Sequence, residues 1–158
     1  MSGVGSSREE ADVINLEVIG IVRAPVQKVF DYLVELENWP RWQSDMKESR
    51  IVAGERGKVG AKYQYLSKAM GQTFNSTVQL SRVEPGRLVE FEGEWVGMIR
   101  PNGAYRVEAV PEGSRVTLNP HPETRGFGSL IAPLMSMMIK GLNRKHLDAL
   151  RQELEGKG

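Results

Sequence analysis

The chain has 158 residues, with 21 Lys and Arg against 20 Asp and Glu, and it contains no cysteine. A chain of this length has the size of one ordinary domain and can bury about 70% of its unfolded surface, so it needs neither disulfides nor a structural metal. Without cysteine, a disulfide framework, a zinc ribbon, a redox CxxC pair and a thiol nucleophile are excluded. A net charge of +1 without a long basic run also disfavours nucleic acid as the main partner.

The first twelve residues are small and polar and lack the apolar stretch of a secretory signal. We expect residues 1–12 to be a flexible tail and residues 13–158 to form a single domain. The longest apolar cluster, LIAPLMSMMI at 130–139, is far shorter than the roughly 20 residues of a membrane-spanning helix. We therefore expect a soluble protein without stable membrane insertion, and the lack of cysteine fits a cytoplasmic location.

The chain opens with a strand pattern and then a helix pattern. Residues 13–22 are rich in β-branched side chains, and alternate apolar residues from Ile14 to Val22 share one face, which predicts a strand. Pro25 follows, at a position that suits the first turn of a helix. From Val26 to Val34 apolar residues recur at three- and four-residue spacing, which predicts an amphipathic helix of about three turns.

Two tryptophans flank a proline in the segment ENWPRWQ at 37–43. We expect Pro40 to end or bend the preceding helix, and a short helical segment to follow at about Trp42–Met46. Trp39 is expected to fill the gap between this helix and the sheet. Trp42 is expected either to do the same or to face a cavity entrance.

From residue 48 onwards the apolar pattern has a period of two, which predicts about six antiparallel strands. The segments GERGKVG at 54–60, EPG at 84–86, PNG at 101–103 and PEG at 111–113 have turn chemistry and are predicted to join these strands. A long helix is predicted at about 129–155, apolar nearly all round in its first half. The order of elements indicates an α+β fold, in which a curved antiparallel sheet of about seven strands wraps round the C-terminal helix.

Four segments of the chain carry a resemblance to a known group: APVQKVFDYLVELENWPRW, KVGAKYQY, VEPGRLVEFEGEW and GLNRKHLDALRQELE. They resemble the START and Bet v 1-like (SRPBCC) superfamily with its helix-grip fold, and within it the polyketide cyclase/dehydrase and lipid-transport family. The resemblance covers about residues 13–155. It implies a hydrophobic cavity between sheet and helix for lipids, sterols, quinones, polyketides or plant hormones. Members of the superfamily share no catalytic motif, so no catalytic residue is carried over to this chain.

Inward strand positions and the covering helix supply a set of aromatic, methionine and polar side chains. These residues either line a cavity or pack as core, and the sequence leaves both readings open. A buried tyrosine hydroxyl needs a hydrogen-bond partner, which a polar-headed ligand can provide, and methionine suits an adaptable apolar surface. The candidate ligand-binding residues are Trp42, Tyr63, Tyr65, Phe74, Ser76, Phe91, Trp95, Tyr105, Phe127, Met135 and Met138.

The leading functional hypothesis is a protein that binds a hydrophobic small molecule between its sheet and its C-terminal helix. The first alternative is a polyketide cyclase, aromatase or dehydratase without metal or covalent nucleophile, with Tyr63, Tyr105 and Arg100 as candidate catalytic residues. The second alternative is a protein-binding module of co-chaperone type, or a homodimer, that uses the apolar start of the last helix. We expect no cofactor and no metal, and we favour structural roles for His121 and His146.

Overall fold

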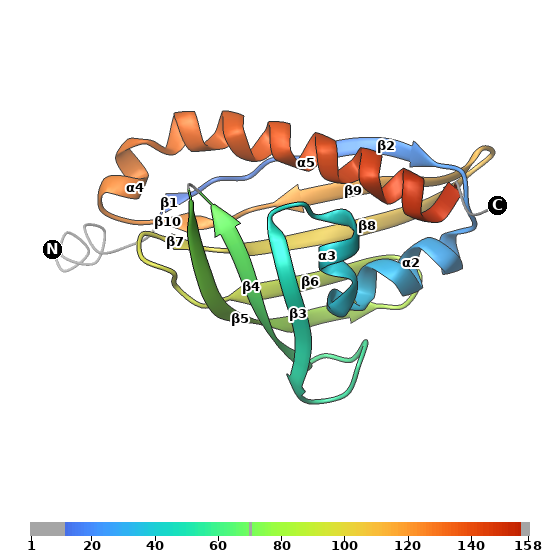
Figure 1. The fold of residues 1–158 in the computed structure, drawn as a ribbon. Coiled ribbons are helices and arrows are strands. Elements are labelled where there is room, and N and C mark those ends of the chain that lie inside the picture. Colours follow the sequence, from blue (N-terminus) through green and yellow to red (C-terminus); the bar gives the residue numbers. More distant parts are fainter. Residues whose placement is uncertain (1–11, 70, 156–158) are drawn as a thin grey trace, which may run out of the picture.

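The computed structural model describes residues 12–69 and 71–155 and is an α+β structure dominated by one large antiparallel sheet (Figure 1). The sheet has seven strands in the order β2-β9-β8-β6-β5-β4-β3. These strands are β2 (Val18–Val22), β3 (Met46–Ala53), β4 (Lys62–Ala69), β5 (Gln72–Glu84), β6 (Leu88–Gly93), β8 (Asn102–Val110) and β9 (Gly113–Pro120). This arrangement confirms the fold class predicted from the sequence.

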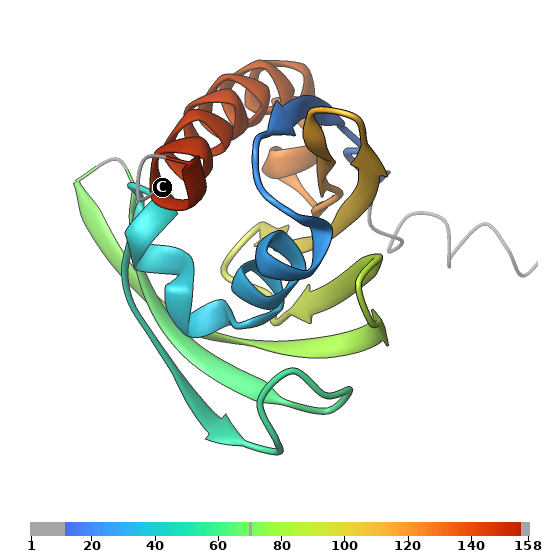
Figure 2. The same cartoon turned by 90° about the vertical axis from the view of Figure 1, so that its right-hand side faces the viewer.

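A smaller three-stranded sheet and five helical segments complete the part of the chain that the structure describes. The small sheet pairs β1 (Asp12–Val13), β10 (Glu123–Thr124) and β7 (Ile99–Arg100). The helical segments are α2 (Val26–Val34), the 3₁₀ turn η1 (Leu36–Asn38), α3 (Trp39–Trp42), α4 (Phe127–Leu130) and α5 (Ala132–Glu155). Seen end-on, the large sheet curves round an interior that α5 closes on its open side (Figure 2).

The curvature of the sheet has a local cause in the pairing of its strands. The β3–β4 ladder shifts register twice, at Met46/Glu48 and at Ile51/Ala53, and the β5–β6 ladder shifts between Leu80 and Arg82. Such irregularities bend a strand and increase its twist. They allow the concave face of the sheet to surround α2, α3 and one side of α5.

The C-terminal half of α5 is fixed closely against β2. Gly20 on β2 makes this possible, because a Cβ there would lie 2.6 Å from Leu147 Cδ2 and would also meet the Arg151 guanidinium. The Arg151 Nε donates a hydrogen bond of 2.9 Å to the Ile21 carbonyl oxygen. The buried residues of α5 all lie in this half of the helix: His146, Leu147, Leu150 and Leu154.

Further contacts hold the end of α5 to the first helix. The Lys28 ammonium group donates to the Leu154 carbonyl oxygen at 3.2 Å, and the Tyr32 hydroxyl donates to a Glu153 carboxylate oxygen at 2.9 Å. Burial, and next the Glu153 carboxylate that accepts this hydrogen bond, raise the pKa of Tyr32. The N-terminal half of α5 has no buried residue, so it is held less firmly than the C-terminal half.

Several element boundaries differ from the sequence-based predictions. The predicted strand at 13–22 is divided into β1 and β2, and the chain between them leaves the ladder to follow the edge of β9. The first helix ends at Val34, and Pro40 lies in the first turn of α3, so this proline begins a helical turn instead of ending one. The predicted tail at 1–12 lies outside the described residues except for Asp12, which belongs to β1.

One prediction was wrong in the second half of the chain, and one element differs there at its start. The PNG segment at 101–103 is not a hairpin turn, because Asn102 and Gly103 begin β8 and pair with Glu92 and Phe91 of β6. The predicted helix at 129–155 is interrupted, since α4 ends at Leu130 and α5 starts at Ala132.

Adding a methyl group at Gly20 should loosen the attachment of α5. We expect Gly20→Ala to lower the free energy of unfolding by about 1–3 kcal/mol, because the new Cβ overpacks against Leu147. The matched control is Gly141→Ala on α5, where no heavy atom lies within 4 Å of an added Cβ. Because alanine favours the helix, the control should gain up to about 1 kcal/mol. Urea denaturation measures the free energy of unfolding of both variants. Equal values for Gly20→Ala and Gly141→Ala would contradict close packing of α5 on β2.

Candidate ligand-binding cavity

A cavity of about 190 Å³ lies between the concave face of the sheet and the middle of α5. It is bounded by α3 and the residues that follow it, by six strands of the large sheet, by Ile99 of the small sheet, by the 120–122 segment and by α5. Most of the lining is aromatic or aliphatic, with a few amide, carboxylate and imidazole groups. The lining residues are Trp39, Gln43, Asp45, Met46, Tyr65, Val78, Phe91, Ile99, Pro101, Asn102, Gly103, Tyr105, Asn119, Pro120, Pro122, Ile139, Leu142, Asn143 and His146.

Four aromatic rings from α3 and the sheet form the floor of the cavity. Trp39 packs edge-on against Phe91 and Tyr65, with centroid separations of 5.3 and 5.7 Å, and Phe91 lies 5.3 Å from Tyr105. Gly103 leaves room for this arrangement, because a Cβ at that position would lie 2.7 Å from Phe91 Cζ. Edge-to-face packing of this kind holds each ring in one orientation, so the floor of the cavity is rigid.

The Tyr105 hydroxyl is the centre of a buried hydrogen-bond network in the cavity wall. It accepts hydrogen bonds from Trp39 Nε1 and from Gln43 Nε2, each at 3.0 Å. Burial is the largest cause that raises the pKa of Tyr105, so the group is a neutral phenol across the physiological pH range. The network connects α3 and the segment after it to the middle of the sheet.

A second polar group in the wall is formed by Asp45 and His146. His146 Nε2 lies 3.2 Å from Asp45 Oδ1, but the two atoms are not aligned for a hydrogen bond, and both are buried. The Trp42 ring packs between the two polar groups, 5.4 Å from the Tyr105 ring and 6.1 Å from the His146 ring. The wall therefore carries two sets of polar atoms on either side of a buried indole.

The structure places only part of the predicted residue set at this cavity. Tyr65, Phe91 and Tyr105 line it, while Trp42 is buried directly behind the wall. Trp39, expected only to fill the gap between helix and sheet, faces the cavity, while Trp42 fills the space beneath it, which is the first of the two roles expected for that residue.

The remaining predicted residues lie outside the lining. Tyr63 is fully buried elsewhere on β4, near the Glu35 carboxylate but without a hydrogen bond of regular geometry. Phe74, Ser76 and Met135 are half-buried at other positions, and Trp95 stacks under the Arg125 guanidinium at 4.2 Å from the ring centroid. Phe127 and Met138 are exposed, with 59% and 56% of their surfaces accessible.

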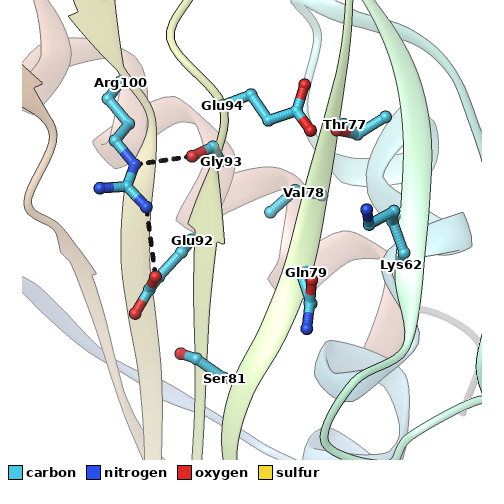
Figure 3. Close-up of a pocket in the computed structure, with 9 residues that line it drawn as sticks. All are labelled: Lys62, Thr77, Val78, Gln79, Ser81, Glu92, Gly93, Glu94 and Arg100. Atoms are coloured by element: carbon cyan, nitrogen blue, oxygen red, sulfur yellow. Dashed lines mark hydrogen bonds and ion pairs between the residues drawn. The ribbon is translucent and has the colours of Figure 1, made fainter.

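Arg100 lies at a different pocket, on the outer face of the sheet (Figure 3). Its Nε donates to the Gly93 carbonyl oxygen at 2.8 Å, and its terminal nitrogens lie 3.3 Å from Glu92 and from Glu123. The other lining residues include a basic side chain, an acidic side chain and several neutral polar ones: Lys62, Glu94, Thr77, Gln79 and Ser81. The guanidinium is thus occupied by fixed partners away from the central cavity.

Several cavity residues were not found from the sequence. Ile139, Leu142, Asn143 and His146 all lie on the inner face of α5 at a spacing of three or four residues, a pattern that a helical projection reveals. Asn102 and Gly103 were missed because their residue types indicated a turn. No sequence pattern marks Gln43 and Asp45, which lie in the short connection between α3 and β3.

A curved antiparallel sheet closed by a long helix round an aromatic cavity defines a helix-grip protein. In a comparison with protein families, residues 15–155 match the family described as "Polyketide cyclase / dehydrase and lipid transport". The chain belongs to this family of the START and Bet v 1-like superfamily, as the sequence resemblance predicted.

Individual relatives agree with this assignment. A protein of Streptomyces halstedii named "Putative polyketide cyclase" is 27% identical over 94 residues, which covers 52% of this chain and 86% of the relative. The protein TTHA0849 from Thermus thermophilus has a similar structure, with a TM-score of 0.74 at 18% identity, over 93% of this chain and 99% of the other. The ZhuI aromatase/cyclase from Streptomyces sp. R1128 has a TM-score of 0.74 at 13% identity, over 92% and 94% of the two chains.

Within residues 12–69 and 71–155, no helix is long and apolar enough to cross a membrane. In the same part of the chain, no group of three or more His, Asp or Glu side chains is arranged to hold a metal ion.

Removing the Tyr105 hydroxyl should destabilise the protein measurably. In Tyr105→Phe, Trp39 Nε1 and Gln43 Nε2 both lose their acceptor, and we expect the free energy of unfolding to fall by about 1–3 kcal/mol. Tyr63→Phe removes the same atom from a tyrosine whose hydroxyl makes no regular hydrogen bond, so its cost should be well below that of Tyr105→Phe. Urea denaturation of both variants tests this. An equal loss of unfolding free energy in the two variants would contradict the hydrogen-bond network around Tyr105.

Proposed function

We propose that the protein binds an apolar small molecule of lipid or polyketide type in the central cavity. The observation that carries this proposal is the space between the sheet and α5, lined mostly by aromatic and aliphatic side chains with a few polar groups among them. This combination is typical of small-molecule sites, where apolar lining supplies affinity and a few polar groups set orientation. Membership of a family that includes lipid transport supports the same reading.

The size of the cavity limits what it can hold without rearrangement. At about 190 Å³ it is smaller than the roughly 300–1,000 Å³ of sites for drug-sized ligands, so it suits a compact molecule. A longer ligand needs the N-terminal half of α5 to move outwards. The attachment of α5 permits this, because the buried contacts of the helix are confined to its C-terminal half.

A second candidate function is cyclisation or dehydration of a polyketide-like substrate in the same cavity. It is favoured by the Asp45 and His146 pair in the wall, two groups that can accept and return a proton. The names of the Streptomyces relatives point in the same direction. Among the catalytic candidates from the sequence, Tyr105 fits this proposal, whereas Tyr63 and Arg100 lie outside the lining. Turnover of a linear poly-β-ketone by wild type but not by His146→Leu would distinguish catalysis from binding alone.

A bulky residue inside the cavity should abolish binding. We expect wild type to bind naphthalene, a compact apolar probe, in equilibrium dialysis, and Leu142→Trp to bind it at least tenfold more weakly because the indole occupies the space. The matched control is Leu134→Trp, the same change at an exposed position of α5, where 57% of the leucine surface is accessible. This control should bind naphthalene as wild type does.

The exposed apolar face at the start of α5 is the rival binding surface. It consists of Phe127, Leu130, Leu134, Met137 and Met138. Met137→Asp places a charge in the middle of this face without touching the cavity. If naphthalene binding is lost in Met137→Asp and kept in Leu142→Trp, the ligand binds on the surface and the cavity proposal is wrong. Light scattering of the same variant tests the homodimer: an unchanged oligomeric state removes this face as a subunit contact.

A further inference from the structure

The Tyr105 hydroxyl accepts two hydrogen bonds but donates none within the described residues, and this bears on the kind of ligand that the cavity prefers. Both donors to its hydroxyl oxygen are fixed, because an indole nitrogen can only donate and Gln43 is also oriented as a donor. A phenolic oxygen that accepts two hydrogen bonds has its lone pairs occupied, so its own proton points in a third direction. Within the described residues, no hydrogen bond from this proton is formed, although the residue is only 5% exposed.

The space nearest to this network is the cavity. Tyr105, Trp39 and Gln43 all line it, so the hydroxyl and its two donors belong to side chains that border the same space. A buried donor without an acceptor costs free energy that water or a ligand oxygen can return. The wall therefore presents a preorganised donor to whatever occupies the cavity, and its direction is set by Trp39 and Gln43.

The same wall also holds a carboxylate without a regular hydrogen bond at its buried oxygen. Asp45 Oδ1 is buried 3.2 Å from His146 Nε2 but forms no hydrogen bond of regular geometry with it, and His146 is only 4% exposed. The Asp45 carboxylate is close enough to influence two cavity tyrosines. Burial is the largest cause that raises the pKa of Tyr65 and of Tyr105, their hydrogen bonds lower it, and the negative charge of Asp45 raises it further. A carboxylate can only accept hydrogen bonds, so this side of the wall suits a ligand that donates one.

We propose that this wall makes the cavity selective for aromatic ligands that carry a hydroxyl group at the end facing α3. Tyr105 donates to an oxygen of the ligand, and the Asp45 carboxylate accepts a hydrogen bond from a ligand hydroxyl. The aromatic floor of Trp39 and Phe91 holds the apolar body of the ligand. Phenols and enolised ketones have this combination of a flat apolar body and an oxygen that can both accept and donate. The inference rests on the proposed binding function and names the class of ligand for the same cavity.

The experiment compares two probes that differ by one oxygen atom, naphthalene and 2-naphthol, in equilibrium dialysis with the full chain. We expect wild type to bind 2-naphthol about tenfold or more tightly than naphthalene, the gain from one buried hydrogen bond to a preorganised partner. In Tyr105→Phe this preference should fall below threefold, while naphthalene still binds and so reports an intact cavity. Tyr63→Phe, which removes the same atom outside the lining, should keep the wild-type preference.

A second variant tests the acceptor side independently. Asp45→Ala removes the carboxylate and should also lower the ratio of 2-naphthol affinity to naphthalene affinity several-fold. A preference that survives in Asp45→Ala overturns the acceptor role of the carboxylate, and one that survives in Tyr105→Phe overturns the donor role.

The outcomes separate this inference from the proposed function. Equal binding of the two probes by wild type overturns the selectivity and leaves cavity binding in place. Failure of both probes to bind overturns the proposed function itself.

Discussion

The attachment of α5 at only one of its ends is the constraint on which the rest of the structure depends. Gly20 brings the backbone of β2 within reach of Leu147 and Arg151, and the Arg151 side chain then bonds to the strand. Because this contact is close, the C-terminal half of the helix behaves as part of the core. The other half has half-buried and exposed side chains but no fully buried one, and the cavity lies beneath the transition between the two halves.

The opposite side of the cavity is kept open by α3 and the residues around it. The short helical turn WPRW directs Trp39 into the interior and Trp42 beneath it, three positions later. Trp39 is then fixed twice, by its packing on Phe91 and by its hydrogen bond to Tyr105. A side chain held by both packing and a hydrogen bond cannot collapse into the empty space, so the cavity persists with a rigid floor.

The sequence was sufficient for the fold and for three of the aromatic residues on the sheet side of the cavity. Strand parity alone places Tyr65, Phe91 and Tyr105 on the concave face, and all three line the cavity. The strand pattern failed at Asn102 and Gly103, because the residue types of PNG indicate a turn whereas both residues pair with β6. Glycine is needed at position 103 because a Cβ there would meet Phe91. The sequence also could not position Phe127 and Met138, which depend on the break between α4 and α5 and on where the sheet ends beneath the helix. The polar wall was beyond the sequence, since Asp45 and His146 meet only through the packing of α5 on α3.

The proposed ligand site lies under the middle of α5, between the two halves of that helix. Nuclear Overhauser contacts between bound naphthalene and assigned methyl groups locate the ligand. Binding in the cavity predicts contacts to the methyl groups of Ile139, Leu142 and Val78, which come from both sides of the cavity. Contacts confined to Leu130 and Leu134, on the exposed face of the helical region, would contradict it.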